Sequence, residues 1–220
     1  MCSFVTNGSF YLHGDAAMFD NNRTKIAFAN ALIELMKDTP FDKISTSSII
    51  SACGASRRTF YYHFKDKQDL ICWYFDWDIS TALGTSEIVV DNEGRRKPFV
   101  NALLHYMYSQ REIYANALSS TAQNSLRSHL FDFIYQYRRH QIIALLNGRH
   151  MDPLGIKFLA EYFTNAIIGI ILNWAEDGMS YPPERFDSGY YNVTTVCMQA
   201  VVDKFSEATA PFGAERYLDK

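Results

Sequence analysis

The sequence predicts an all-α fold, with a three-helix N-terminal domain followed by a larger helical C-terminal domain. Apolar residues recur three and four positions apart through most of the chain, which is the spacing of amphipathic helices. No segment shows sustained strand alternation. Glycine and proline mark the breaks, most clearly at Asn147-Gly148 and at Gly178 followed by Pro182-Pro183. With 220 residues, 48% of them hydrophobic, the chain can build a sizeable core.

The first part of the chain predicts a flexible tail followed by one helix. Residues 1–22 are polar, rich in glycine and asparagine, and show no helical period. Apolar residues then recur at helical spacing from Ile26 to Met36, so we expect a helix over 24–37. Pro40 ends it, because the residue before a proline disfavours the helical conformation.

Two short helices joined by a tight turn come next. Ser45 is placed to cap a helix over 46–53, and Gly54 suits the position that ends it. Ser56 can cap a further helix over 57–64. This is the layout of a helix-turn-helix, whose second helix enters the major groove of DNA with its N-terminal residues leading. The spacing alone fits a plain surface helical hairpin equally well.

The rest of the chain predicts one long amphipathic helix and then five more, with a polar stretch at 84–97. The expected helices span 67–83, 98–109, 111–120, 123–147, 154–176 and 184–208. We therefore divide the chain into a tail at 1–22, a helix-turn-helix domain at 23–70 and a helical domain at 71–220.

Charge is unevenly distributed along the chain. Residues 23–70 contain eight basic and five acidic residues, which gives this segment a net charge of +3. Because the whole chain has a net charge of −3, the remaining residues carry a net charge of −6. A basic module suits a phosphate-binding surface, because Lys and Arg displace the counterions condensed on a nucleic acid. Two other basic clusters, at 95–97 and 138–140, are expected to be solvated surface.

The second short helix has two distinct faces. Phe60 and Phe64 are four residues apart, so they share one face, which must pack inward. The side chains that project elsewhere are Arg57, Arg58, Tyr61 and Tyr62. Arginine can bond guanine O6 and N7 bidentately, and tyrosine can meet a thymine methyl group or a phosphate. Two arginines at a helix start oppose the helix dipole, and a polyanionic partner would remove that objection.

A specific motif runs through residues 24–70. Its residues are Thr24-Lys25, Ala29, Leu32, Phe41-Asp42-Lys43-Ile44-Ser45, Ile49, Ala52-Cys53-Gly54-Ala55-Ser56-Arg57-Arg58-Thr59-Phe60-Tyr61-Tyr62-His63-Phe64-Lys65-Asp66-Lys67 and Leu70. This string, and above all its Thr-Phe-Tyr-x-His-Phe-x-x-Lys segment, resembles the DNA-binding domain of the TetR family of transcription regulators.

The resemblance implies a set of DNA contacts. They are Ser47, Arg57, Arg58, Thr59, Tyr61, Tyr62, His63 and Lys67. Arg57, Arg58 and Thr59 would face the groove, whereas Ser47 and Lys67 would bind phosphates. His63 has two possible roles, a phosphate contact or a bond that caps local structure.

The stretch from Phe158 to Met179 resembles a TetR subgroup whose penultimate helix ends in Trp-x-x-x-Gly-Met, here Trp174 to Met179. That subgroup includes regulators related to the activator of dihydroxyacetone kinase operons. In the family, the last two helices pair with their mates in a dimeric four-helix bundle. The small residues expected to permit close approach of the helices at this interface are Ala160, Ala166 and Gly169.

The aromatic-rich helices of the helical domain offer candidates for an effector pocket, because the helical domain of a TetR-like regulator usually holds its inducer in a mostly apolar cavity between helices. The candidates are Tyr106, Met107, Tyr114, Phe133, Tyr137, Phe163 and Trp174. Each of them fits an ordinary core position equally well. The sequence does not identify the effector.

These observations favour a homodimeric, ligand-responsive repressor that binds a palindromic DNA operator. The alternative is a coactivator of the same fold that works through a protein partner without a small ligand. No motif supports an enzyme, a cofactor or a metal site, since nucleotide-binding glycine patterns and metal-ligand spacings of histidine are not found.

A cytoplasmic location is expected from two further features of the sequence. Its four cysteines are widely separated, and the N-terminus does not have the pattern of a signal peptide. The longest apolar run, 166–172, is too short to span a membrane.

Overall fold

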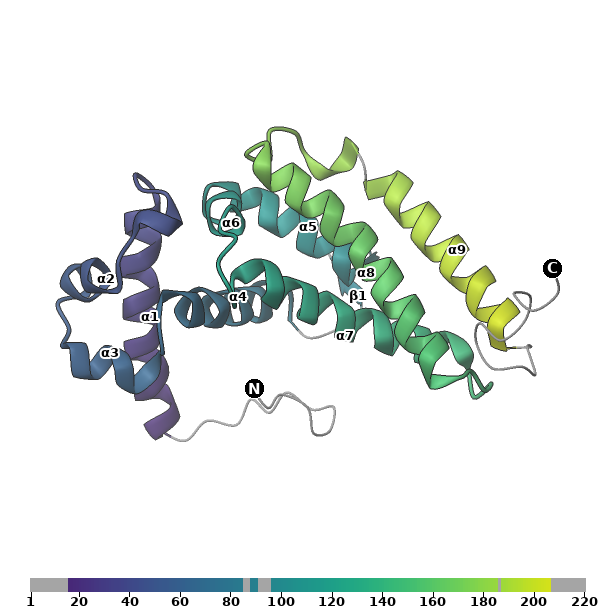
Figure 1. The fold of residues 1–220 in the computed structure, drawn as a ribbon, viewed down its shortest axis with the longest axis horizontal. Coiled ribbons are helices and arrows are strands. Elements are labelled where there is room, and N and C mark those ends of the chain that lie inside the picture. The colour runs from purple at the N-terminus through teal and green to yellow at the C-terminus, as the bar shows by residue number, and fades with distance from the viewer. Residues whose placement is uncertain (1–15, 85–87, 91–95, 186, 207–220) are drawn as a thin grey trace, which may run out of the picture. The chain divides into compact units, whose positions relative to one another are not determined.

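The computed structural model describes residues 16–84, 88–90, 96–185 and 187–206, and these are mainly helical (Figure 1). The helices are α1 (Ala16–Met36), α2 (Thr46–Cys53), α3 (Arg57–His63), α4 (Lys67–Leu83), α5 (Phe99–Ser109), α6 (Arg111–Leu118), α7 (Leu126–Leu146), α8 (Pro153–Glu176) and α9 (Asp187–Ser206), with short 3-10 turns η1 (Phe41–Lys43) and η2 (Pro183–Arg185). The predicted all-α class is confirmed, and most helix boundaries fall within a few residues of their predicted positions.

Two predicted loops are wrong in part. The helix expected from residue 24 begins at Ala16, so residues 16–22 do not belong to a tail, and residues 1–15 lie outside the described part of the chain. The polar stretch at 84–97 contains two strands, β1 (Ile88–Val90) and β2 (Arg96–Pro98), paired antiparallel with Ile88 opposite Pro98. Each strand has three residues, too few for an alternating pattern to stand out in the sequence.

The chain divides into two compact units. The first contains Met1–Thr39 and Lys43–Phe99, and the second contains Pro40–Asp42 and Val100–Lys220. The boundary we placed after residue 70 therefore falls inside α4, which belongs whole to the first unit.

The short segment Pro40–Asp42 belongs to the second unit, although it lies between α1 and α2 in sequence. Phe41 is completely buried, and its backbone N–H donates a hydrogen bond to Oδ1 of Asn116 on α6, at 2.7 Å. This segment is thus fixed by the second unit while its two ends continue into helices of the first.

The core of the first unit forms around α1, which packs against α2 and α4. Phe28 of α1 is completely buried and meets Phe60 edge to face, with ring centroids 5.1 Å apart. Phe64 joins them at 6.4 Å from Phe28. The predicted inward face of the second short helix, Phe60 with Phe64, is therefore confirmed, because both side chains are buried.

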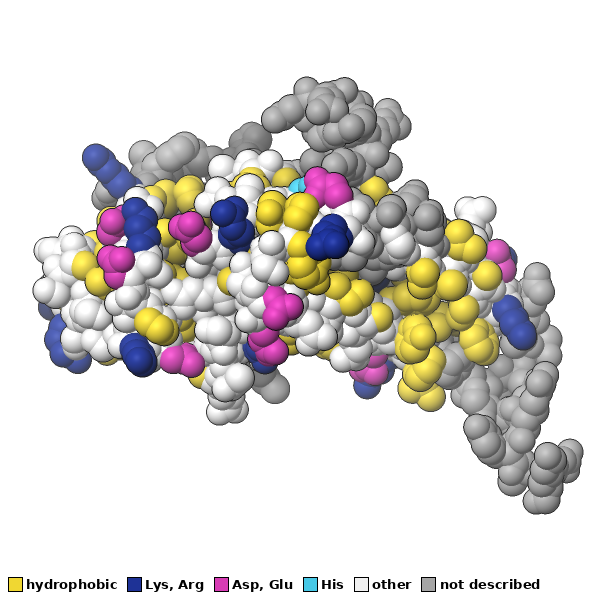
Figure 2. All heavy atoms as spheres, turned by 90° about the horizontal axis from the view of Figure 1, so that it is seen from above, with side chains coloured by type: hydrophobic (Ala, Val, Ile, Leu, Met, Phe, Trp, Pro, Cys, Tyr) yellow, Lys and Arg dark blue, Asp and Glu magenta, His cyan; other side chains and the backbone are white. Residues whose placement is uncertain are grey.

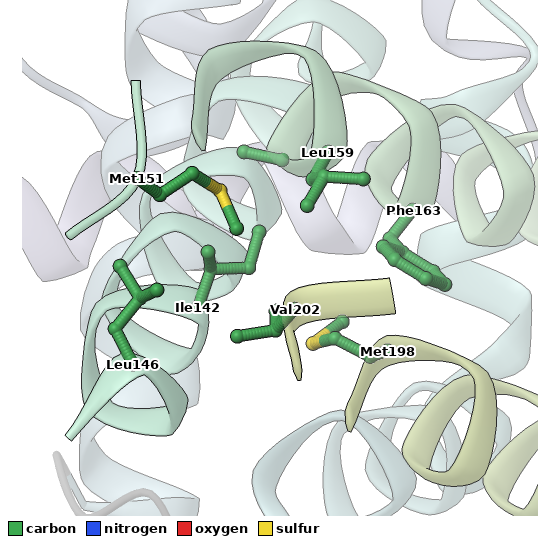
Figure 3. Close-up of a cluster of buried hydrophobic side chains, with 8 residues drawn as sticks. Ile142, Leu146, Met151, Leu159, Phe163, Met198 and Val202 are labelled. Carbon is green, nitrogen blue, oxygen red and sulfur yellow. The ribbon is translucent and has the colours of Figure 1, made fainter. Parts of the chain in front are cut away.

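The core of the second unit lies between α7, α8 and α9. Figure 3 shows one cluster of buried apolar side chains there, to which all three helices contribute. Its members are Ile142, Leu146, Met151, Leu159, Ala160, Phe163, Met198 and Val202. At the other end of α8, the guanidinium of Arg127 on α7 forms a salt bridge with Glu176 at 2.8 Å. These contacts show that α7 and α8 run antiparallel side by side (Figure 1).

The Trp-x-x-x-Gly-Met signature at the end of α8 forms a helix cap. Gly178 has φ of 66° and Met179 has φ of 51°, so the chain turns through the left-handed region where glycine is favoured. The Met179 N–H donates to the Trp174 carbonyl at 2.7 Å, and the Trp174 indole N–H donates to the Tyr181 carbonyl at 2.8 Å. Trp174 is completely buried and thereby anchors the turn that follows its own helix.

The core-facing ridge of α7 contains one charged residue. Its members recur every four residues, and they are Leu126, Leu130, Ile134, Arg138, Ile142 and Leu146. Arg138 is only 3% exposed, so the basic cluster at 138–140 is not simply solvated surface as predicted, although Arg139 and His140 are exposed. The four-residue period of the apolar neighbours is the sequence signal that places Arg138 inside.

α8 is rich in apolar residues and is, among the described residues, the one helix whose length and composition could cross a membrane. The helix has 24 residues, and charged residues such as Lys157 and Glu161 interrupt its apolar sequence. One side of α8 packs in the core of the second unit, and a core helix of a soluble protein passes the same test of length and composition.

Candidate nucleic-acid interface

Side-chain caps fix where α2 and α3 begin. The Ser45 hydroxyl accepts from the Ser48 N–H at 3.0 Å, and the Ser48 hydroxyl accepts from the Ser45 N–H at 3.1 Å, which is a reciprocal capping box. The Ser56 hydroxyl accepts from the Thr59 N–H at 3.0 Å at the start of α3. Both predicted caps are confirmed, and they define the ends of two short helices that have little intrinsic stability.

The turn between the two helices depends on Gly54. Its φ of 68° lies in the left-handed region, and its N–H bonds back to the carbonyls of Ile50 and Ser51. A Cβ atom added at this position would meet no neighbour within 4 Å, so the requirement for glycine comes from the backbone conformation rather than from a lack of space. The turn at Gly54 changes the chain direction, and Ser56, two residues later, caps the start of α3.

α3 presents a polar and aromatic face to solvent. Arg57 and Arg58 in its first turn are exposed. Tyr61 is 51% exposed and Tyr62 is 80% exposed, which is high for such large rings. Because the opposite face is buried against Phe28, the exposed face is presented in a fixed orientation. Cationic and phenolic groups held in this way suit contacts with bases and phosphates.

Two of the other predicted contacts are linked to neighbouring side chains. The guanidinium of Arg57 donates to the Ser47 hydroxyl at 3.3 Å, which brings the starts of α2 and α3 together. The hydroxyl of Thr59 lies 2.8 Å from that of Ser56, so part of its bonding capacity is used at the helix cap. Ser47 and Arg57 are both exposed, and together they can serve one phosphate.

Lys67, at the start of α4, has a structural contact that the sequence did not reveal. Its ammonium donates to the Ile44 carbonyl at 2.8 Å, 23 positions back along the chain. This bond ties α4 to the residue immediately before the Ser45 cap. An ammonium has three donors, so Lys67 can make more than one hydrogen bond.

His63, in the last turn of α3, is half-buried. Its ring meets that of Tyr62 edge to face at 4.9 Å. Burial, and then the nearby positive charge of Lys25, lower the pKa of His63 below its ordinary value. His63 is therefore favoured as the neutral imidazole, which can donate one hydrogen bond to a phosphate.

An aromatic stack beside this face was not predicted. Trp73 and Trp77 on α4 are stacked with centroids 6.1 Å apart, and Phe64 lies 5.8 Å from Trp73. The ammonium of Lys25 sits 5.5 Å above the Trp73 ring. The four-residue spacing of the two tryptophans is the signal that could have found this stack. The stack links α1, the end of α3 and α4, and so helps to fix the position of α3.

The predicted pocket residues do not gather in one place. Phe163 belongs to the cluster in Figure 3, whereas Trp174 stacks on Tyr108 at 5.9 Å. These two residues of α8 are about 16 Å apart along the helix axis. Of the remaining candidates, Met107 and Tyr114 are buried, and Tyr106, Phe133 and Tyr137 are half-buried. The seven candidates are thus spread over α5, α6, α7 and α8.

The side of α8 opposite its core carries a continuous apolar stripe, and α9 carries a shorter one. We call these residues the apolar face, and they are Leu154, Phe158, Tyr162, Ala166, Gly169 and Ile170 on α8 with Val193, Val196, Cys197 and Ala200 on α9, all of them exposed. Figure 2 shows hydrophobic side chains gathered on this side of the second unit. Ala166 and Gly169 lie on it as expected for the predicted interface, but Ala160 is completely buried in the core of its own subunit.

Two family models match the chain. Residues 30–71 match the model described as bacterial regulatory proteins of the tetR family, which covers the caps, the turn and α3. Residues 96–195 match the model described as a transcriptional regulator C-terminal region. Together they cover well over half of the sequence.

Comparison with individual proteins agrees with the two family models. The chain is 30% identical over 69 residues to the HTH-type dhaKLM operon transcriptional activator DhaS of Lactococcus lactis, a match that spans 31% of this chain and 34% of that relative. A solved structure of the dihydroxyacetone kinase operon activator DhaS matches 83% of this chain and 97% of its own, with a TM-score of 0.51 at 19% identity. A TetR transcriptional regulator from Streptococcus agalactiae matches 81% and 98%, with a TM-score of 0.51 at 20% identity. Both structures share the fold.

Proposed function

Because the chain belongs to the TetR family of transcription regulators, we propose that it is a ligand-responsive repressor that binds a palindromic operator as a homodimer. The observation that carries the proposal is the exposed face of α3, where two arginines and two tyrosines are held outward by the packing of Phe60 and Phe64 inward. TetR-family regulators bind DNA and are dimers. The DNA contacts of this chain are Ser47, Arg57, Arg58, Thr59, Tyr61, Tyr62, His63 and Lys67, and it acts in the cytoplasm.

The apolar face supports the homodimer. Soluble monomers rarely expose a large contiguous apolar surface, and this one runs along most of α8 and a part of α9. Gly169 and Ala166 carry small side chains at its centre, which permits close approach of a second α8. We place the interface on these residues and not on Ala160, because its methyl group is enclosed in the core of its own subunit.

Cys197 offers a direct test of this interface. It is an exposed thiol on the apolar face, whereas Cys53 and Cys72 are half-buried in the first unit. In the dimer, Cys197 should react with a thiol reagent at least several-fold more slowly than in a protein monomerised by Tyr162→Glu. Equal reactivity of Cys197 in both proteins would place the interface elsewhere.

DNA binding is tested by selecting operator fragments from random DNA with the full-length protein. The selected sequences should be palindromic, with half-sites one helical turn (about 34 Å) apart, because each α3 reads only a few base pairs. Selection of asymmetric sites would contradict binding by two copies of the helix-turn-helix domain, which we call the two heads of the dimer. No enrichment at all would contradict sequence-specific binding.

A second candidate function is favoured by the relative DhaS of Lactococcus lactis, which is a transcriptional activator. In that case the chain binds its operator and raises transcription through a protein partner without a small ligand. Transcription in vitro from a template carrying the selected operator separates the two candidates. A repressor lowers transcript yield with no other protein added, whereas a coactivator leaves it unchanged until its partner is supplied.

A further inference from the structure

Lys25, on α1, is a cation that rests on aromatic rings. The side chain is half-buried, and its ammonium lies 5.5 Å from the centre of the Trp73 ring and 5.9 Å from that of the Phe64 ring. Among the described residues, this ammonium has no hydrogen bond and no ion pair. The attraction between a cation and an aromatic face holds the ammonium in place without neutralising its charge.

The acidic side chains at the corner between α3 and α4 are used to hold the backbone. The Asp66 carboxylate accepts from the Asp69 N–H at 2.9 Å and so caps the start of α4. The Asp69 carboxylate accepts from the Lys65 N–H at 3.0 Å. Neither carboxylate pairs with Lys25, so the positive charge of Lys25 is left uncompensated beside the end of α3.

His63 lies in the same cluster as Lys25. Its ring centroid is 6.3 Å from that of Phe64, the ring over which the Lys25 ammonium sits. Burial, and then the positive charge of Lys25, lower the pKa of His63, so the two groups are within electrostatic range of each other. The two helices are neighbours here because Phe28 of α1 packs on Phe60 of α3 (Figure 1). All of these residues belong to the first compact unit.

A neutral imidazole is an incomplete ligand for a DNA phosphate. It can donate one hydrogen bond, but it brings no positive charge and therefore releases no counterion from the DNA. A phosphate that accepts a hydrogen bond from His63 would also lie in the field of Lys25. The ammonium has three donors and the charge that the imidazole lacks.

We infer that Lys25 is a further DNA-binding residue, which supplies the positive charge to the same backbone phosphate that His63 contacts. The inference rests on the proposed function, and it adds α1 to the helices that bind DNA. The rings of Trp73 and Phe64 position the ammonium. Lys25 contributes to affinity and not to sequence preference, because a phosphate is the same at every base pair.

The test measures binding of the full-length protein to the selected operator and to random-sequence duplex DNA over a range of salt. Lys25→Met should lower affinity for both DNAs several-fold and flatten the plot of log affinity against log salt by about 0.9 per head. Lys25→Arg should keep the slope of the wild type, because arginine retains the charge and also stacks on aromatic rings.

Lys37→Met is the matched control, since it removes the same charge from the same helix. Lys37 is exposed and its ammonium pairs with the Glu34 carboxylate at 2.6 Å, in contrast to Lys25. This control should keep both the affinity and the salt slope of the wild type. Equal slopes in Lys25→Met and Lys37→Met would overturn the inference.

A purely structural role of Lys25 gives a different result. Loss of the contact between the cation and the rings would lower the midpoint of thermal unfolding of the DNA-free protein and leave the salt slope unchanged. A wild type that binds DNA, together with an unchanged slope in Lys25→Met, would overturn this inference alone. A wild type that binds neither DNA would overturn the proposed function as well.

A double-variant cycle with His63→Phe tests whether the two residues share one phosphate. Phenylalanine keeps a ring beside Tyr62 and Phe64 but removes both ring nitrogens. Groups that act at one site are not independent, so the loss of affinity in the double variant should be several-fold smaller than the product of the two single losses. A loss equal to that product would place Lys25 and His63 at different phosphates and overturn the shared contact.

Discussion

Substitution of Lys67 by methionine should weaken both the fold and DNA binding. The ammonium of Lys67 is half-buried and donates to the Ile44 carbonyl at 2.8 Å. A hydrogen bond from a charged group contributes about 1.5–3 kcal/mol when well shielded, and partial exposure reduces this to ~1 kcal/mol. Methionine keeps the apolar stem, so the loss is confined to the bond and the charge. The midpoint of unfolding should fall by about 2–4 °C for a chain of this size.

The effect on DNA binding has a different signature. If Lys67 also binds a phosphate, as the resemblance implies, the plot of log affinity against log salt should flatten by about 0.9 per head. Affinity for operator and for random DNA should fall equally, because a phosphate contact carries no sequence information. Titration of both DNAs over a range of salt, alongside thermal unfolding, gives the two readouts independently.

Lys65→Met provides the matched control. Lys65 is exposed and lies two residues from Lys67, so the Lys65→Met substitution removes the same charge from the same region. It should leave the unfolding midpoint unchanged. A Lys67→Met protein as stable as this control would refute the structural role of the bond to Ile44. An unchanged salt slope in Lys67→Met would refute the phosphate contact.

Three other substitutions test the remaining assignments. Arg58→Ala should weaken operator binding by about 1–3 kcal/mol and relax preference at one base pair per half-site, and an equal loss on random DNA would make Arg58 a phosphate contact. Gly169→Arg should leave each protomer folded, because Gly169 is exposed and a Cβ added there meets nothing within 4 Å, but should give monomers by light scattering with poor operator affinity. His63→Gln should reduce the loss of stability between about pH 7 and pH 5. The lowered pKa of His63 means that the unfolded chain binds more protons there, and identical pH profiles would contradict it.

Much of the candidate interface could be predicted from the sequence, because it depends on local interactions. The caps at Ser45 and Ser56 and the turn at Gly54 each involve residues within a few positions of one another. The inward face of Phe60 and Phe64 follows from helical spacing alone. Each of these signals can be recognised from a short segment of the sequence, because the residues that interact are close together in it.

The features that were missed depend on contacts between distant segments. The bond of Lys67 spans 23 positions, and the anchoring of Phe41 to Asn116 spans 75. Arg138 stands beside two exposed basic residues in the sequence, which predicts surface, whereas its burial follows from the four-residue ridge to which it belongs. Six aromatic residues and Met107 are pocket candidates by residue type, whereas their grouping depends on which helices pack together.

The short length of α3 explains why the apolar face matters for DNA binding. With seven residues, α3 is about 10 Å long, whereas one turn of DNA is about 34 Å. A single head therefore makes few base contacts, and tight specific binding requires a second head held by dimerisation. In the proposed homodimer, any change that alters the pairing of α8 and α9 with their mates also alters operator affinity.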